Sequence, residues 1–259
     1  MAEDEVKLPH EAQITIYETK EFKFSKGTII DGFPSVGLVS TIAVNYIVNQ
    51  LEMEQVGVVV SPYFPPASII RNGVPSHPVR VYAGSNLICF LSEFKPPAPL
   101  VLPITNELMN YAKGKGASLI ISPEGMGCQS EDTSSCKAFG VGTTPAATKR
   151  VKDNGVELLE NGMITGISGM LLNEGARLGK DVICIIAEAK ENFPDAKAAV
   201  RLVQIMDKIM PEVEIDTKPL EKEAEKLEKE IKEALAKVQA PLAGHENPVT
   251  VEAPAGMYR

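Results

Sequence analysis

The apolar and polar positions of the chain fall into two repeating patterns between residues 10 and 215. Short, continuously apolar runs predict strands that are buried on both faces of a sheet. These runs are 28–30, 55–60, 86–91, 117–122 and 182–187. Amphipathic segments with apolar positions at helical spacing alternate with them, at 38–51, 101–115, 142–155 and 195–209. Alternating strands and helices predict an α/β fold, with a mostly parallel sheet covered on both faces.

Several segments carry weaker patterns. Shorter strands are predicted at 12–17, 22–24, 139–141 and 156–159. Residues 69–82 predict a hairpin region that turns at Asn72 and Gly73. Residues 162–179 predict a strand followed by a helix, in which Gly166 and Gly169 allow close packing of a neighbouring backbone. Thr143 or Thr144 is expected to cap the helix of segment 142–155.

The segment Thr28–Leu51 is the opening strand–loop–helix unit of this pattern. Its loop contains Gly32, Pro34, Ser35 and Gly37, and Ser35 is placed to cap the helix that follows. A helix N-terminus after a glycine-rich turn is an anion site, so Gly32, Ser35 and Gly37 form a candidate ligand loop. Neither GxxxxGK[ST] nor GxGxxG is present. A tight turn that binds nothing is the simpler alternative.

The composition changes after Thr217. Residues 218–239 are rich in Glu, Lys and Ala and predict a charged amphipathic helix. Its apolar positions form an a/d seam, which is expected to pack on the body or on a neighbouring subunit. The alternative is a solvated helix that docks only through a narrow stripe. The seam is Leu220, Ala224, Leu227, Ile231, Ala234 and Val238. Prolines and glycines in 240–259 predict a flexible tail. The expected organisation is therefore an α/β domain over 1–217, this helix and this tail.

Charge and hydropathy indicate which kinds of partner and which cellular compartment are expected. The net charge of −8 argues against nucleic acid, because its binders need a basic face. The sequence has no apolar run of about 18 residues, so no membrane partner is expected. The acidic segment 1–13 lacks the apolar stretch of a signal peptide. We therefore expect a cytoplasmic protein.

The four cysteines do not predict a metal site. Cys89 and Cys184 lie inside apolar strands and are expected to be buried core residues. Cys128 and Cys136 do not have the spacing of a zinc-binding pair, and no histidine is near them. Whether these two form a disulfide or remain thiols is left open. No metal and no cofactor are predicted.

Three stretches of the sequence resemble the PAC2 family, the relatives of proteasome assembly chaperone 2. They are DGFPSVGLVSTIAVNYIV at 31–48, NGMITGISGMLLNEG at 161–175 and FPDAKAAVRLVQIMDKI at 193–209. The resemblance implies a phosphorylase/hydrolase-like, three-layer α/β sandwich. It also implies a role as a proteasome assembly chaperone, as an ATP-independent proteasome activator, or as both.

The chain ends in Met257, Tyr258 and Arg259, which resemble the HbYX motif of proteasome activators. The resemblance implies that the apolar residue and the tyrosine ring enter a pocket between adjacent α subunits of the 20S proteasome. The terminal carboxylate on Arg259 then pairs with a lysine of that pocket. Because one short peptide binds weakly, we expect a homo-oligomer, a tetramer or another small ring or cage, that presents several tails.

An enzyme is the alternative interpretation. None of the three histidines accompanies a Ser or Cys nucleophile motif. Acidic residues do follow or lie near predicted strand ends, where open α/β sheets bind ligands. They are Asp31, Glu93, Glu124, Glu174 and Glu188, with Glu124 and Glu188 the first to test. The alternative function is binding or hydrolysis of a nucleoside- or phosphate-like molecule at the Gly32–Gly37 loop. The main expectation is a protein that is not an enzyme.

Overall fold

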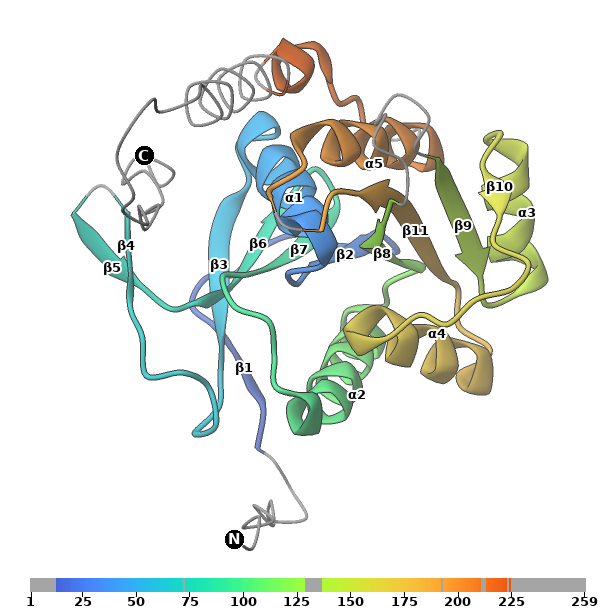
Figure 1. Ribbon diagram of the computed structural model, residues 1–259. Coiled ribbons are helices and arrows are strands. Elements are labelled where there is room, and N and C mark those ends of the chain that lie inside the picture. Colours follow the sequence, from blue (N-terminus) through green and yellow to red (C-terminus); the bar gives the residue numbers. More distant parts are fainter. Residues whose placement is uncertain are drawn as a thin grey trace, which may run out of the picture.

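The computed structural model describes residues 13–71, 73–128, 137–191, 193–210, 213–222 and 224. Within them, the main sheet has nine strands and carries helices on both faces (Figure 1). The predicted α/β fold is confirmed. In spatial order the strands are β1 (Thr15–Glu18), β3 (Glu54–Val60), β6 (Val79–Gly84), β7 (Leu87–Ser92), β2 (Thr28–Gly32), β8 (Leu119–Gly127), β11 (Val182–Ala189), β9 (Ala138–Gly142) and β10 (Glu157–Leu158).

The sheet is mixed, and the parallel arrangement is concentrated at its centre. Strands β7, β2, β8 and β11 pair in parallel, whereas β1, β3, β6 and β7 pair antiparallel, as do β11 and β9. The antiparallel pairing of β6 with β7 has a local cause. Ser85 and Asn86 join β6 to β7 and both have positive φ, the conformation of a tight two-residue hairpin turn. Such a turn can connect only antiparallel strands.

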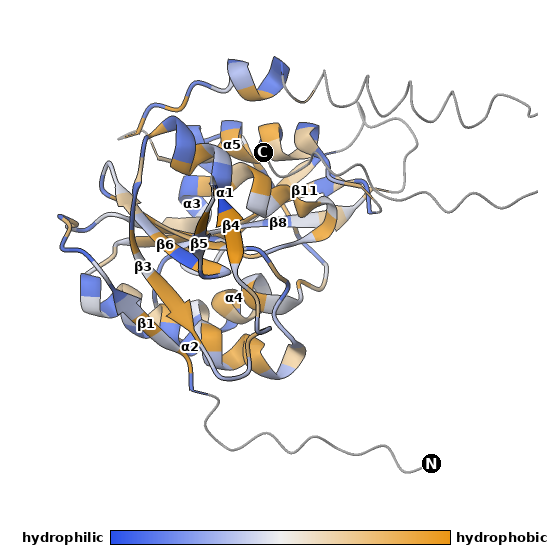
Figure 2. Ribbon diagram, turned by 90° about the vertical axis from the view of Figure 1, so that its left-hand side faces the viewer, coloured by the Kyte–Doolittle hydropathy of each residue, from blue (hydrophilic) through white to orange (hydrophobic). Residues whose placement is uncertain are grey.

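The helices make the other two layers. Figure 1 shows α1 (Val39–Gln50) and α5 (Ala196–Ile209) on one face of the sheet, with α2 (Ala98–Lys115) and α4 (Gly166–Leu178) on the opposite face. The view from the side in Figure 2 shows the same separation. A third helix on the first side, α3 (Pro145–Asp153), packs on β9. The structure is therefore the expected three-layer sandwich.

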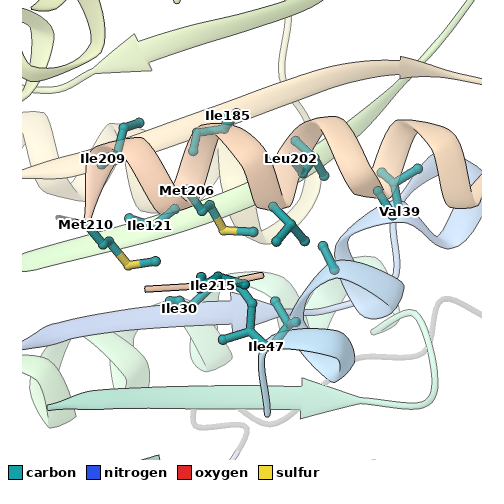
Figure 3. Close-up of a cluster of buried hydrophobic side chains, with 14 of the residues drawn as sticks. Ile30, Val39, Ile47, Ile121, Ile185, Leu202, Met206, Ile209, Met210 and Ile215 are labelled. Atoms are coloured by element: carbon teal, nitrogen blue, oxygen red, sulfur yellow. The ribbon is translucent and has the colours of Figure 1, made fainter. Parts of the chain in front are cut away.

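Two core clusters occupy the spaces between the layers. In the α1/α5 core, apolar side chains of α5 lie over isoleucines of the central strands (Figure 3). They include Leu202, Met206 and Ile209 of α5, which lie close to Ile30, Ile121 and Ile185 of the strands. In the α2/α4 core, Ile29, Ile88 and Ile120 pack with Leu100, Ile104 and Leu108. Successive strand residues point to opposite faces, so a strand buried on both sides must be apolar throughout.

Helix ends follow the predicted chemistry at several points. The Thr144 hydroxyl accepts a hydrogen bond from the Ala147 amide at 3.0 Å, which caps α3 as expected. At α5, the Asp195 carboxylate accepts one from the Ala198 amide at 2.9 Å. The hairpin predicted around Asn72–Gly73 is present as β4 (Ile69–Arg71) and β5 (Val74–Ser76).

Two predicted strands are wrong. Residues 22–24 form no strand; Phe22 and Phe24 are apolar because both side chains pack against the α2/α4 core. Residues 162–165 are also irregular, and α4 begins directly at Gly166. Helix α2 starts at Ala98, three residues before its predicted start, with prolines in its N-terminal turn.

The first part of the predicted C-terminal helix contacts the body of the protein. Residues 218–222 are helical, and Leu220 and Ala224 are buried in the α1/α5 core. These are the first two positions of the apolar seam, and they dock on this chain itself. The later seam positions and the tail 240–259 lie outside the described residues.

The described residues test part of the predictions about cysteines and membrane segments. Cys89 and Cys184 are buried free thiols of the sheet, as predicted. Cys136 lies outside the described residues, and with it the predicted alternatives for the Cys128–Cys136 pair. Within the described part of the chain, the helices lack the length and apolar character that crossing a membrane requires.

Candidate functional site

A cavity of about 400 Å³ lies at the carboxyl ends of the parallel strands β2, β8 and β11. Three further segments line this cavity. They are the loop after β2, residues 95–98, and residues 159–165, which lead into α4. The acidic side chains of its lining are Asp31 and Glu124, and Lys95 is the basic one. The carboxyl edge of adjacent parallel strands is where open α/β sheets bind ligands.

The sheet register explains why the two acids share this cavity. Ile30 of β2 pairs with Ile121 of β8, so the next residues along each strand, Asp31 and Ser122, are neighbours. Side chains alternate between faces, which places Asp31 and Glu124 on the α2/α4 side, opposite to Ile30 and Ile121. Two strands that are far apart in sequence therefore place both carboxyl groups on the same side of the sheet, at the cavity.

Asp31 is an unusual buried acid. Its side chain is 1% exposed, and its Oδ2 atom has no hydrogen-bond partner within the described structure. Burial raises its pKa from 3.8 to about 7, and the nearby Glu124 charge adds to the rise. Hydrogen bonds from the Ser122 hydroxyl and the Phe33 amide lower the pKa, but burial dominates. Near neutral pH, this group can therefore be found in either protonation state.

Glu124 is held more firmly. Its Oε2 accepts a hydrogen bond from the Ser168 hydroxyl at 2.6 Å, and its Oε1 accepts one from the Gly125 amide at 3.0 Å. Burial nevertheless raises the Glu124 pKa, while those hydrogen bonds and the Lys95 charge oppose the rise. Ser168 belongs to the first turn of α4, so Glu124 also lies near the positive end of that helix.

Two serine hydroxyls connect the acids. The Ser122 hydroxyl donates to the Ser168 oxygen at 2.8 Å, Ser168 donates to Glu124, and Ser122 also hydrogen-bonds with Asp31. A hydroxyl donates one proton and accepts others, so this chain can run in either direction. In one direction Asp31 holds a proton and Glu124 is ionised, and in the other the proton is on Glu124. The two acids are thus linked through a continuous chain of hydrogen bonds.

The candidate loop residues have different positions. Ser35 lines the cavity, but Gly32 and Gly37 do not. The Ser35 hydroxyl bonds with the Ser40 hydroxyl at 2.5 Å and makes no cap bond to the short 3₁₀ helix η1 (Val36–Leu38) that it precedes. Ser35 is not the residue next to α1, because η1 and a left-handed Leu38 intervene. Its hydroxyl nevertheless accepts a hydrogen bond from the Ser40 amide, in the first turn of α1, at 3.4 Å, as predicted. The ligand role of Gly32, Ser35 and Gly37 stays a prediction.

Gly37→Ala is expected to lower the free energy of unfolding by about 1–2 kcal/mol. Gly37 has φ +64°, and an added Cβ would lie 3.0 Å from the Lys190 carbonyl oxygen. The matched control is Gly114→Ala on α2, where nothing lies within 4 Å of the new Cβ. Urea unfolding of both variants measures the difference. Equal stability of the two variants would contradict this explanation of Gly37.

The remaining strand-end acids make contacts elsewhere. Glu93 pairs with Arg71 and Arg80. Glu174 lies on α4 and pairs with Arg177. The Glu188 carboxylate accepts a hydrogen bond from the Lys137 amide at 2.7 Å. These three acids do not line the cavity, so Glu124 and Asp31 are the two of the predicted five that meet there.

Sequence reasoning missed Lys95, Ser122 and Ser168. A single serine at the end of an apolar run carries no signal of its own, and its role depends on the strand register. Ser168 lies in one of the three family-like stretches, and that was the available signal. Among the described residues, no group of three or more His, Cys, Asp and Glu side chains could hold a metal ion. Met257, Tyr258 and Arg259 lie outside the described residues.

The fold and the cavity define an α/β sandwich protein with a pocket at the edge of its parallel strands. More specifically, the chain belongs to the PAC2 family, whose model matches residues 29–235. The resemblance of the three sequence stretches is therefore confirmed.

Individual relatives agree with this family. The chain is 31% identical to Pyrococcus furiosus PbaA, described as an archaeal homolog of proteasome-assembly chaperone, with a TM-score of 0.80. That match covers 87% of this chain and 93% of PbaA. An uncharacterised protein of Methanocaldococcus jannaschii is 28% identical over 217 residues, which are 83% of this chain and 88% of that protein. Pyrococcus furiosus PbaB, described as an archaeal proteasome activator, is 23% identical with a TM-score of 0.75, over 88% of this chain and 99% of PbaB. This last likeness shows the fold alone.

Proposed function

We propose that this protein binds the 20S proteasome and acts as an assembly chaperone, as an ATP-independent activator, or as both. The observation that carries the proposal is the near full-length match to PbaA, a homolog of proteasome-assembly chaperone. Membership of the PAC2 family supports it. The sequence has no GxxxxGK[ST] motif, which agrees with action without ATP hydrolysis. A cytoplasmic location belongs to the same proposal.

The proposed contact with the proteasome is the C-terminal tripeptide Met257, Tyr258 and Arg259. The apolar side chain and the tyrosine ring enter a pocket between α subunits, and the Arg259 carboxylate pairs with a lysine there. An aromatic anchor beside a paired charge is the usual composition of a binding hot spot. In the sequence, the charged segment 218–239 lies between this tripeptide and the α/β body, and its described residues Leu220 and Ala224 are buried in that body.

The proposal includes a homo-oligomer, a tetramer or another small ring or cage. A single tripeptide binds weakly, whereas several tails on one assembly raise the apparent affinity by about a hundredfold or more when they dock together. Native mass spectrometry of the full chain at micromolar concentration measures the number of subunits. A monomer would contradict this part of the proposal.

The tail is tested with two variants of the full chain. Tyr258→Ala removes the aromatic anchor, and we expect at least a tenfold loss of apparent affinity for a cognate 20S core particle. Thr250→Ala lies in the same tail and serves as the matched control, with no loss expected. Fluorogenic peptide hydrolysis is read in parallel. Faster hydrolysis that depends on Tyr258 indicates an activator, and binding without acceleration indicates an assembly chaperone.

The proposal describes a binding protein rather than an enzyme. PbaA is described as a homolog of a chaperone and PbaB as an activator, and neither description names a reaction. Three histidines occur in the sequence, and His77, the one within the described residues, does not line the cavity.

A further inference from the structure

We infer that the cavity at the ends of β2 and β8 binds a small molecule that carries a protonated amine on an apolar body. In this site, Asp31 and Glu124 receive the ammonium group. The inference does not depend on binding to the proteasome, since it rests on the described residues of the α/β body alone.

The first support is the unpartnered Oδ2 atom of Asp31. A buried acceptor without a donor costs about 1–3 kcal/mol, so folded proteins seldom keep one without a reason. The Phe33 amide and the Ser122 hydroxyl already bond with Asp31, yet Oδ2 has no donor among the residues that the structure describes. The residue lines the cavity, so a ligand can supply the missing donor.

The second support is the charge around that atom. Glu124 on β8 lies near enough to Asp31 to raise its pKa. Burial raises the pKa of the Cys184 thiol on β11, and the charges of both acids add to that rise. The cation on the cavity lining is Lys95, an exposed residue in the connection before α2. A phosphate here would meet two carboxyl groups, whereas an ammonium group gives the Asp31 Oδ2 atom a donor and the Glu124 carboxylate an opposite charge. The cavity therefore favours a cation over the anion that the loop alone predicts.

The third support is the apolar wall. The cavity volume lies in the range of ordinary small-molecule sites. Apolar side chains surround the acids, chiefly Phe33, Val101, Met126, Met163, Ile164 and Ile167. Met163 is 87% exposed, although it is a large apolar residue, and a bound apolar body would cover it. A cationic head near the strands and a hydrocarbon body toward Met163 match this arrangement.

Binding of an amine must be linked to protonation. The ammonium group binds ionised Asp31, and Asp31 has a pKa of about 7 in the folded protein. Its ionised fraction rises about tenfold between pH 6 and pH 8, while an alkylamine stays protonated throughout this range. We therefore expect the affinity for an amine to rise about tenfold over this interval.

The experiment uses the full chain and two matched probes. Isothermal titration with 2-phenylethylamine and 2-phenylethanol is run at pH 6 and pH 8. We expect the amine to bind at least tenfold more tightly than the alcohol at pH 8, and to lose about tenfold in affinity at pH 6. Isoamylamine serves as a second, smaller amine, so that the shape of one body does not decide the result.

Variants connect the result to the site. Asp31→Asn is expected to weaken amine binding at least tenfold and to remove its pH dependence. Glu124→Gln tests the same site independently, in case one variant folds poorly. Asp153→Asn, on the surface of α3, is the control and should change neither the affinity for the amine nor its pH dependence. Equal binding of amine and alcohol, no saturable binding of either amine, or unchanged binding by Asp31→Asn would overturn the inference.

Discussion

Glu93→Ala is expected to lower the free energy of unfolding by about 3–5 kcal/mol, because it leaves a buried charge without its partner. The Arg80 side chain is 0% exposed, and its guanidinium group pairs with the Glu93 carboxylate. The guanidinium also donates to the His77 carbonyl at 3.5 Å, while its Nε has no partner in the described structure. Without Glu93, little remains to offset the desolvation of the Arg80 cation. Urea unfolding measures the loss.

The other partner of Glu93 supplies the control. Arg71 bonds with the same Oε1 atom at 2.7 Å, but its side chain is 44% exposed. Removal of an exposed ion pair costs little, so Arg71→Ala should lower stability by about 1 kcal/mol or less. Losses of similar size for Glu93→Ala and Arg71→Ala would show that the burial of Arg80 does not govern the effect.

Asp31→Asn is expected to stabilise the protein by about 4 kcal/mol at pH 8 and to have much less effect at pH 4. Folding raises the Asp31 pKa from 3.8 to about 7, so the folded state holds a proton that the unfolded state has released between these values. The stability of the unmodified chain therefore falls, relative to the asparagine variant, as the pH rises from about 4 to about 7. Above about pH 8 the difference is constant.

The measurement is urea unfolding of both proteins at a series of pH values. Comparison with the variant removes the contributions of all other titrating groups. Asp153→Asn, an exposed acid of α3, should follow the unmodified chain throughout. A stabilisation by Asp31→Asn that does not change between pH 4 and pH 8 would contradict the origin of the effect in the Asp31 pKa.

The two predictions describe opposite uses of buried charge. The Arg80–Glu93 pair is internally compensated, and both of its members are needed. Asp31 is not compensated, and the folded protein would be more stable without its charge. Groups whose burial and neighbours shift their pKa in this way cluster at functional sites. The cost of Asp31 to stability is therefore consistent with a ligand site at the cavity.

Much of the fold could be predicted because the central strands are apolar on both faces. Ile29 and Ile30 face opposite core clusters, and this double burial produces the continuous run in the sequence. The antiparallel flank could not be predicted in the same way. Its β6–β7 pair is set by the Ser85–Asn86 turn, whose two residues adopt positive φ without the glycine that usually signals it.

The candidate site was predictable in its parts but not in its assembly. Asp31 and Glu124 stand out as acids at the ends of apolar strands, and both line the cavity. The two carboxyl groups lie near each other because β2 and β8 are adjacent in the sheet. The distance between the two strands along the sequence does not reveal this adjacency. Ser168 reaches Glu124 from α4, which follows residues 162–165, an irregular segment where the sequence pattern predicts a strand. The adjacency of β2 and β8 and the Ser168–Glu124 hydrogen bond both depend on the tertiary structure.

The measurement that tests the account most directly is binding to a cognate 20S core particle by biolayer interferometry. The untagged full chain is compared with a chain that ends at Gly256 and therefore lacks Met257, Tyr258 and Arg259. The account predicts saturable binding of the full chain and a loss of at least tenfold in apparent affinity for the shortened one. Absence of binding by the full chain would contradict the proteasome proposal, and equal binding by both would contradict the role of the tail.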